Sequence, residues 1–243
     1  MSKLTIEEFK NIISSLPKPS DEKESKKVNY LHKGLIEQTI RLVIKNGDIS
    51  YLNCFPTTSP YIDYTFLQSC EVGNLEFVKE ILKRFDIKEE SFNTSFEIAC
   101  ARNKLNIVEF LIDKLFDPKF DEQTCLKIAS EKENVKLLKI LLKNNNVFNF
   151  NLGEFNSKIF RTACKNGNLE FLKVLLENDK NGDVDVHANG EEGIRLASEN
   201  RHISIVEYLL RDNNKLKIDI DIDDGELWMS EGVQDILNNI KGE

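Results

Sequence analysis

The stretch CEVGNLEFVKEIL at residues 70–82 recurs as CKNGNLEFLKVLL at residues 164–176. Eight of the thirteen positions are identical and stand in the same order, although 94 residues separate the two copies. Self-similarity of this kind is the sequence signature of an array of small structural units. Further copies are therefore expected between and around these two.

Three more copies align in the same 17-residue frame, and they are more divergent. The five frames begin at Phe66, Phe96, Leu126, Phe160 and Ile194, so that successive starts lie 30, 30, 34 and 34 residues apart. A sixth and degenerate copy precedes them at residues 40–52, with Gly47 at its turn. The interval of 94 residues is thus occupied by two additional units.

Each copy predicts two short helices joined by a tight turn. The second helix carries apolar residues at helical spacing, as in Leu75, Val78 and Ile81. The first helix carries a small pair that lets backbones approach closely: Ser69–Cys70, Ala99–Cys100, Ala129–Ser130, Ala163–Cys164 and Ala197–Ser198. Neither helix is long enough to be stable alone, so each unit needs its neighbour to cover its apolar face.

The turn position favours a residue with left-handed backbone geometry. Gly73 and Gly167 occupy it in the two most similar copies, and glycine adopts this conformation without strain. Asn103 is the next best occupant. Glu133 and Arg201 are unfavourable there, so we expect strained or altered turns at those two positions.

These units resemble the ankyrin repeat, a turn and two helices in about 33 residues. The segments GNLEFVKEIL and ASENRHISIVEYLL resemble the family's helix-turn-helix, and VDVHANGEEG at residues 184–193 resembles its extended finger. The resemblance covers roughly residues 35–240, and the composition is similar to that of ankyrin proteins of amoebae, giant viruses and intracellular bacteria. The family's Thr-Pro-Leu-His opening is nowhere intact, since only Thr94 and Thr124 keep its threonine.

The resemblance implies an all-α solenoid of helix-turn-helix units with short β-hairpin or loop fingers. The expected organisation is an N-terminal amphipathic helix and charged linker at 1–30, followed by an array at 31–240. The array comprises a degenerate repeat at 31–60, repeats near 61–90, 91–120, 121–154, 155–188 and 189–222, and a cap at 223–240. Trp228, Val233, Ile236 and Leu237 are expected to form the inner face of that cap.

The N-terminal segment carries one apolar stripe, formed by Leu4, Phe9, Ile12, Ile13 and Leu16. Thr5 and Glu8 have the spacing of a capping box. The helix either docks on the first repeat or binds a groove of another protein. We expect docking, because an exposed stripe of this kind is a liability unless it is used.

Charge and hydropathy restrict the function classes. The net charge of −8 is concentrated in residues 177–243, which sum to about −10, so nucleic-acid binding is not expected. A basic partner surface would suit that third, unless its acidic residues serve only solubility. No apolar run approaches the length of a membrane span, and charges at Glu7, Glu8 and Lys10 interrupt any signal-peptide core. We expect a cytoplasmic monomer, in a host cytoplasm if the protein is viral or a bacterial effector.

Two acidic segments were weighed as cation sites. Residues 179–190 place Asp179, Asn181 and Asp183 like the first ligands of a calcium loop, but Val184 and Gly190 replace its glycine and glutamate. A finger between repeats explains this segment better. Residues 219–226 alternate aspartate with isoleucine, which favours an extended strand over weak cation binding. No metal or cofactor is expected.

The cysteines and histidines do not predict catalysis. Cys70, Cys100 and Cys164 occupy one repeat register, which indicates core packing rather than a nucleophile. His202 stands where the other legible copies have Asn74 and Asn168, at the start of the second helix. No nucleotide-binding, zinc-protease or serine-hydrolase motif is present, so we expect no enzyme.

Partner-binding residues are expected where the copies vary around a constant frame, namely just before each turn and on the fingers. Unconstrained solvent exposure predicts the same variation. Phe92 and Phe155 would be the aromatic anchors if exposed, with burial beneath a finger as the alternative. The candidates are Glu71, Val72, Phe92, Asn93, Arg102, Glu131, Lys132, Phe155, Asn156, Lys165, Asn166, Glu199 and Asn200, with Glu122, Gln123, Asn189 and Glu191 added by the fingers.

The function expected from this resemblance is a non-catalytic scaffold or adaptor that holds a protein partner on the concave ankyrin surface. The N-terminal helix would then recruit a second protein. The alternative is an inhibitor or effector that occludes a single target. A third possibility, less favoured, is an enzyme with unrecognised residues.

Overall fold

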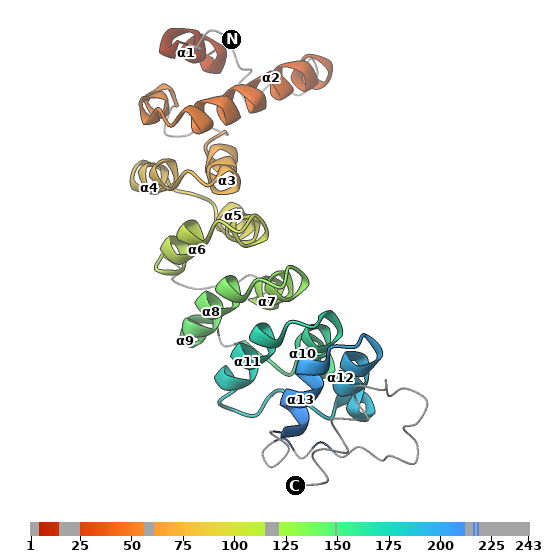
Figure 1. The fold of residues 1–243 in the computed structure, drawn as a ribbon. Helices are drawn as coiled ribbons and strands as arrows, with labels where there is room; N and C mark the ends of the chain where they lie inside the picture. Colours follow the sequence, from red (N-terminus) through yellow and green to blue (C-terminus); the bar gives the residue numbers. More distant parts are fainter. Residues whose placement is uncertain are drawn as a thin grey trace. The chain divides into compact units, whose positions relative to one another are not determined.

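The computed structural model describes residues 5–14, 25–55, 61–114, 122–148, 150–211, 216 and 218. All regular structure in these ranges is helical, which confirms the all-α class, and the fingers that they include are loops (Figure 1). The chain divides into two compact units, residues 1–120 and 121–243. The predicted repeat boundaries remain a prediction, and the predicted cap at 223–240 lies outside the described residues.

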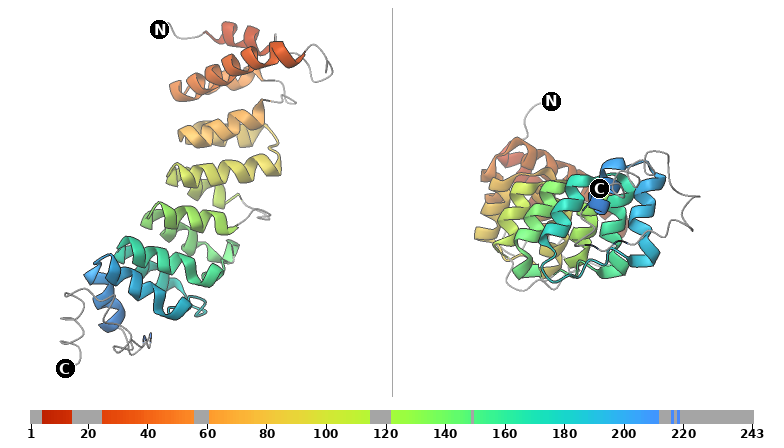
Figure 2. Two further views of the ribbon diagram at one scale, coloured as in Figure 1. Left: turned by 90° about the vertical axis from the view of Figure 1, so that its right-hand side faces the viewer. Right: turned by 60° about the horizontal axis from the view of Figure 1, so that its bottom comes forward.

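Unit 1 stacks its first helices α2, α3 and α5 in one row, with α4 packed between η1 and α6 (Figure 2). Its described elements are α1 (Ile6–Ser14), α2 (Ser25–Asn46), the 3-10 helix η1 (Ile49–Cys54), α3 (Ile62–Val72), α4 (Leu75–Arg84), α5 (Glu89–Ala101) and α6 (Leu105–Ile112). The degenerate first copy thus has a 3-10 helix where the other copies have an α-helix.

Unit 2 repeats this layout, with first helices α7, α10 and α12 in one row and second helices α8 and α11 in contact behind them. Its described elements are α7 (Glu122–Glu131), α8 (Val135–Lys143), α9 (Asn145–Phe148), α10 (Glu154–Asn166), α11 (Leu169–Asn178), α12 (Ala188–Glu199) and α13 (Ile203–Arg211). The frames at Leu126 and Phe160 are separated by four residues more than the preceding frames, and the short helix α9 has this length.

The first helices place large and small residues side by side in the core, which the apolar faces of the second helices complete. Phe66, Phe96 and Phe160 are fully buried, and Cys70 and Cys164 lie beside them with no exposed surface. Burial raises the pKa of both thiols well above its usual range, which disfavours the reactive thiolate. The prediction that the cysteines pack the core is confirmed.

The left-handed turn occurs in all five copies that share the 17-residue frame. Gly73 and Gly167 have φ values of +94° and +81°, while Asn103, Glu133 and Arg201 have 55°, 50° and 60°. A Cβ atom at residue 167 would lie 2.4 Å from Nδ1 of His202, so glycine is required there for space as well as for geometry. The strain predicted for the turns with glutamate and arginine is therefore confirmed by their backbone angles.

At Asn74, Asn168 and His202, the residue that follows the turn joins two repeats. The Asn74 side chain accepts a hydrogen bond from the Phe77 amide (3.2 Å) and donates one to the Ile44 carbonyl of the preceding copy (2.8 Å). It is thus both an N-cap and a link between repeats. Asn134 caps its helix in the same way, at 3.1 Å from the Leu137 amide.

Unit 2 contains two further links of this kind. Asn168 accepts from the Phe171 amide at 2.9 Å and donates to the Glu133 carbonyl at 3.3 Å. His202 replaces asparagine in the last copy and places Nε2 2.8 Å from the Lys165 carbonyl. The imidazole therefore reproduces the inter-repeat half of the link.

The N-terminal helix α1 packs against η1, as the docking interpretation predicts. Phe9 is buried, and its ring centroid lies 5.2 Å from that of Tyr51 and 5.7 Å from that of Phe55. The capping box is present: the Thr5 amide donates to Glu8 Oε2 (2.8 Å) and the Glu8 amide donates to Thr5 Oγ1 (3.2 Å). Leu4, Leu16 and residues 18–24 of the charged linker lie outside the described residues, whereas its last three residues, 25–27, are helical and begin α2.

Replacement of a strained turn residue by glycine should stabilise the array. For Glu133→Gly we expect a free energy of unfolding higher by about 0.5–1 kcal/mol, because relief of left-handed strain exceeds the entropic cost of glycine. Urea unfolding of the full chain measures this change. Lys136→Gly, in the exposed interior of α8, is the matched control and should lower the free energy by about 0.5–1 kcal/mol. Equal destabilisation by both variants would contradict the account of the turn.

The Asn168 side chain makes two contacts whose contributions to stability can be measured separately, the helix cap and the hydrogen bond to the preceding repeat. Asn168→Ala removes the cap and the inter-repeat hydrogen bond, and should lower the free energy of unfolding by about 1–2 kcal/mol. Asn168→Asp keeps the cap acceptor but loses the donor to Glu133, so its cost should be smaller. If aspartate costs as much as alanine in urea unfolding, the cap contributes nothing.

Candidate functional site

The predicted binding residues of unit 1 take part in packing and ion pairs. Glu71, half-buried at the end of α3, is 2.8 Å from Arg102 and 3.5 Å from Arg41. The buried Gln68 amide donates to Glu71 (3.2 Å) and accepts from Arg41. This network ties α2, α3 and the residue after α5 together, so Glu71 and Arg102 have a structural role in addition to any role in binding.

The aromatic candidate of unit 1 is also used in packing. The Phe92 ring is half-buried and stacks on Phe66 with 5.8 Å between centroids. Val72 and Asn93 are half-buried as well. The second aromatic candidate, Phe155, and its neighbour Asn156 lie in α10, and their side chains are outside the described part of the structure.

The predicted candidates of unit 2 are exposed at the carboxyl ends of its first helices. Six residues share this position: Glu131, Lys132, Lys165, Asn166, Glu199 and Asn200. The Asn200 amide donates to the Leu196 carbonyl of its own helix (2.8 Å), and the Lys165 carbonyl is the partner of His202. Glu131 lies 4.0 Å from the Lys127 ammonium. All six residues remain candidates for partner binding.

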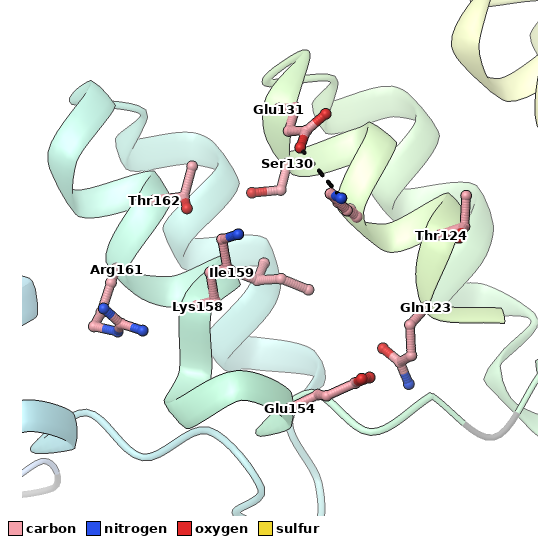
Figure 3. Close-up of a pocket in the computed structure, with 10 residues that line it drawn as sticks. Gln123, Thr124, Ser130, Glu131, Glu154, Lys158, Ile159, Arg161 and Thr162 are labelled. Carbon is pink, nitrogen blue, oxygen red and sulfur yellow. Dashed lines mark ion pairs between the residues drawn. The ribbon is translucent and has the colours of Figure 1, made fainter. Parts of the chain in front are cut away.

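Unit 2 also contains a groove of about 460 Å³ between α7 and α10. Figure 3 shows Gln123 and Glu154 facing each other at one end of it and Ser130 opposite Thr162 at the other. Lys158 and Ile159 project from α10 between these ends, and Thr124, Lys127, Glu131 and Arg161 complete the lining. Among the predicted candidates whose side chains the structure describes, Gln123 and Glu131 line this groove.

The acidic side chains of the groove are paired within the protein. Glu131 lies 4.0 Å from the Lys127 ammonium on the same helix. The Gln123 amide, in the orientation that satisfies its neighbours, donates to Glu154 (3.1 Å) and accepts from the Asn151 amide (2.8 Å). Both carboxylates therefore have a partner before any ligand arrives.

The α7–α10 pair differs from other first-helix pairs in how it is bridged. Arg161 of α10 forms an ion pair with Glu192 of α12, and both side chains are mostly buried. The hydrogen bond from Asn189, and then the neighbouring Arg161, lower the pKa of Glu192. Within the described ranges of unit 2, no ion pair spans from α7 to α10. The space between these two helices is therefore open to another molecule.

The residues that line the groove on α10 escaped prediction because their role depends on packing. Lys158 occupies an exposed position of its repeat, and Ile159 and Thr162 occupy half-buried ones. The spacing of 34 residues between the frames at Leu126 and Phe160 does not mark this place, because the same spacing separates Phe160 from Ile194, where Arg161 and Glu192 bridge α10 and α12.

The finger before α12 uses its acidic residues to order its own backbone. Both carboxylate oxygens of Asp179 accept backbone hydrogen bonds, from Asp183 (2.8 Å) and Val184 (2.9 Å). The Asp185 amide donates to Ser157 of α10 (2.7 Å). These contacts support the finger interpretation of the segment over the calcium loop.

The same finger holds an ion pair that responds to pH. His187 Nδ1 lies 2.6 Å from Glu191 Oε1, at the start of a left-handed run formed by Asn189, Gly190 and Glu191. The hydrogen bond that His187 donates to Glu191 raises the pKa of His187, against the effect of burial, and the Leu216 backbone adds to the increase. Protonation of His187 therefore favours this form of the finger.

Stability should depend on pH through His187. A group with a raised folded-state pKa stabilises the fold fully below its unfolded pKa, about 6.5, and loses this contribution as pH rises through the folded value. The native chain should exceed His187→Gln in unfolding free energy at pH 5.5 by more than at pH 8.5, in urea titrations at both values. A difference that is independent of pH would contradict this assignment.

Comparison with models of known families identifies the chain. The model of ankyrin repeats (three copies) matches residues 66–154 and again residues 148–224, which together cover well over half of the sequence. The chain therefore belongs to the ankyrin-repeat family. No curated protein and no solved structure gives a significant match. In the ranges that the structure describes, no helix is both long and apolar enough to cross a bilayer.

Proposed function

We propose that this protein is a non-catalytic interaction protein that binds a protein partner on the surface formed by its first helices and fingers. Ankyrin repeats generally serve as protein–protein interaction modules, and this family membership is the basis of the proposal. The groove between α7 and α10 of unit 2, beside the exposed ends of the first helices, is the observation that assigns the proposed binding to particular residues. The family resemblance predicts this surface to be concave.

The absence of a catalytic role is part of the proposal. Burial raises the pKa of Cys70 and Cys164, so the two thiols are poor nucleophiles. Across the described ranges, no cluster of three histidine, cysteine or acidic residues has the arrangement of a metal site. Binding to nucleic acid is not proposed, because the net charge of −8 repels phosphate backbones.

The position of α1 favours binding of a single partner over a two-partner adaptor. An adaptor would need the apolar face of α1 for a second protein, but Phe9 and Ile13 are buried, with Phe9 packed on the aromatic rings of the η1 region. We therefore favour a protein that holds or occludes one target through its array. The proposed setting is the cytoplasm, with the chain acting as a monomer.

Capture from a cell lysate with matched variants tests this function. One variant carries Lys132→Ala, Asn166→Ala and Asn200→Ala at the ends of the first helices. The control carries Lys136→Ala, Lys143→Ala and Glu177→Ala on exposed positions of the second helices. Quantitative mass spectrometry measures the amount of each captured protein. We expect the first variant to capture at least about tenfold less of a specific partner, which corresponds to about 1.4 kcal/mol of binding free energy. The control should capture the same amount as the native chain.

Two results would contradict the proposal. One is retention of every specific partner by the first-helix variant. The other is equal loss by both variants, which would place the interaction elsewhere or indicate that the substitutions disturb the fold. Circular dichroism of each variant distinguishes these two causes of equal loss.

A further inference from the structure

The groove between α7 and α10 contains one positive charge that the protein leaves unpaired. Lys158 is exposed on α10, and within the described part of the chain its ammonium has no carboxylate at ion-pair distance. The two carboxylates of the lining have partners within the protein. Glu131 forms an ion pair with Lys127 at 4.0 Å, and Glu154 accepts a hydrogen bond from Gln123 at 3.1 Å. Glu154 keeps its negative charge beside Gln123, and Lys158 is the cation of the lining that has no carboxylate partner among the described residues.

Two hydroxyl groups of the groove, those of Ser130 and Thr162, have no hydrogen bond to any described residue. Ser69 and Ser95, which are buried in unit 1, donate to the carbonyl four residues earlier at 2.7 and 2.6 Å. The Ser130 hydroxyl makes no such bond and points toward α10, and Thr162 lies opposite on the other wall (Figure 3). Both hydroxyls are therefore able to donate to a ligand in the groove.

The remaining surface between these polar groups is apolar. Ile159 projects from α10 toward α7 and is half-buried (Figure 3). A ligand that complements the groove therefore has an aliphatic stem over Ile159 and an anionic, hydrogen-bond-accepting head near Lys158 and Ser130. Among protein side chains, glutamate and aspartate have this combination.

We propose that the α7–α10 groove binds a carboxylate side chain from an acidic segment of a protein partner. Lys158 supplies the charge, the hydroxyls of Ser130 and Thr162 supply donors, and Ile159 supports the stem. This proposal rests on the proposed function and names the chemical class of its partner.

Charge in the surrounding sequence favours an acidic segment over a polyanion. Residues 121–176, which include both walls, sum to about +3, whereas residues 177–243 sum to about −10. Lys158, Arg161 and Lys165 follow one face of α10 at helical spacing. A short segment with a few carboxylates meets only this basic part, while a long polyanion would also meet the acidic remainder.

A peptide titration of the full chain tests this proposal. The probe is a capped pentapeptide with two glutamates around a central isoleucine, and its control has glutamine in place of both glutamates. Backbone chemical shifts of isotope-labelled protein report the contact. We expect saturable shifts on α7 and α10 with the acidic peptide, and at least about tenfold weaker binding of the glutamine peptide.

Charge exchange at residue 158 provides the decisive variants. Lys158→Glu should weaken the acidic peptide at least about tenfold and strengthen a matching peptide that carries two lysines. Lys136→Glu on α8 makes the same change of charge away from the groove and should leave both affinities unchanged. Because Lys158 is exposed, its substitution is compatible with an unchanged fold, which the shifts of the remaining residues verify.

Three results would overturn the proposal: equal binding of the two peptides, unchanged binding by Lys158→Glu, or no saturable shift at about 1 mM acidic peptide. The failure of the proposed function is a separate outcome. If the acidic peptide fails but the Lys132, Asn166 and Asn200 variant still loses its captured partner, the interaction stands and only its acidic chemistry is wrong. If that variant also retains every partner, the proposed function itself fails.

Discussion

The asparagine that caps the second helix links two repeats at Asn74 and at Asn168, and the array depends on this contact. At each of these positions one side-chain amide accepts from an amide of its own helix and donates to a carbonyl of the preceding repeat. The Phe77 and Phe171 amides have no carbonyl partner within their own helices, because the first turn of a helix leaves such groups open. A helix pair of this length is too short to be stable alone, so the link converts a row of weak elements into a cooperative array.

The same constraint explains where sequence variation is tolerated and where it is not. The turn must be left-handed for the next helix to reach its neighbour, so the chain accepts strain at Glu133 and Arg201 to maintain it. Exposed side chains of the first helices do not form the turn or the link between repeats, and they differ between copies. The binding surface that we propose is therefore formed by the first helices, and it includes the α7–α10 groove, which no ion pair between these two helices spans within the described ranges.

Local features of this fold could be predicted from the sequence, whereas contacts between units could not. The helix pairs, the capping box at Thr5 and the burial of Cys70 each depend on a few consecutive residues or on the repeat register. The network around Glu71 joins residues about 30 positions apart, and the isolation of Lys158 depends on what its neighbours bind instead. The basic partner expected for the acidic C-terminal third remains a prediction. It concerns a different part of the chain from residues 121–176, which include the groove walls and sum to about +3.

Residue-resolved hydrogen exchange of the unmodified chain is the most direct test of the account. The amides of Phe77, Leu137 and Phe171 lie in the first turn of their helices, where exchange is ordinarily fast because no helical carbonyl accepts from them. Each is bonded here to the asparagine that begins its helix. The account predicts that these three amides exchange as slowly as amides in the middle of the same helices. Exchange as fast as that of the neighbouring unbonded first-turn amides would show that the asparagine caps do not form, and would contradict the central role given to them here.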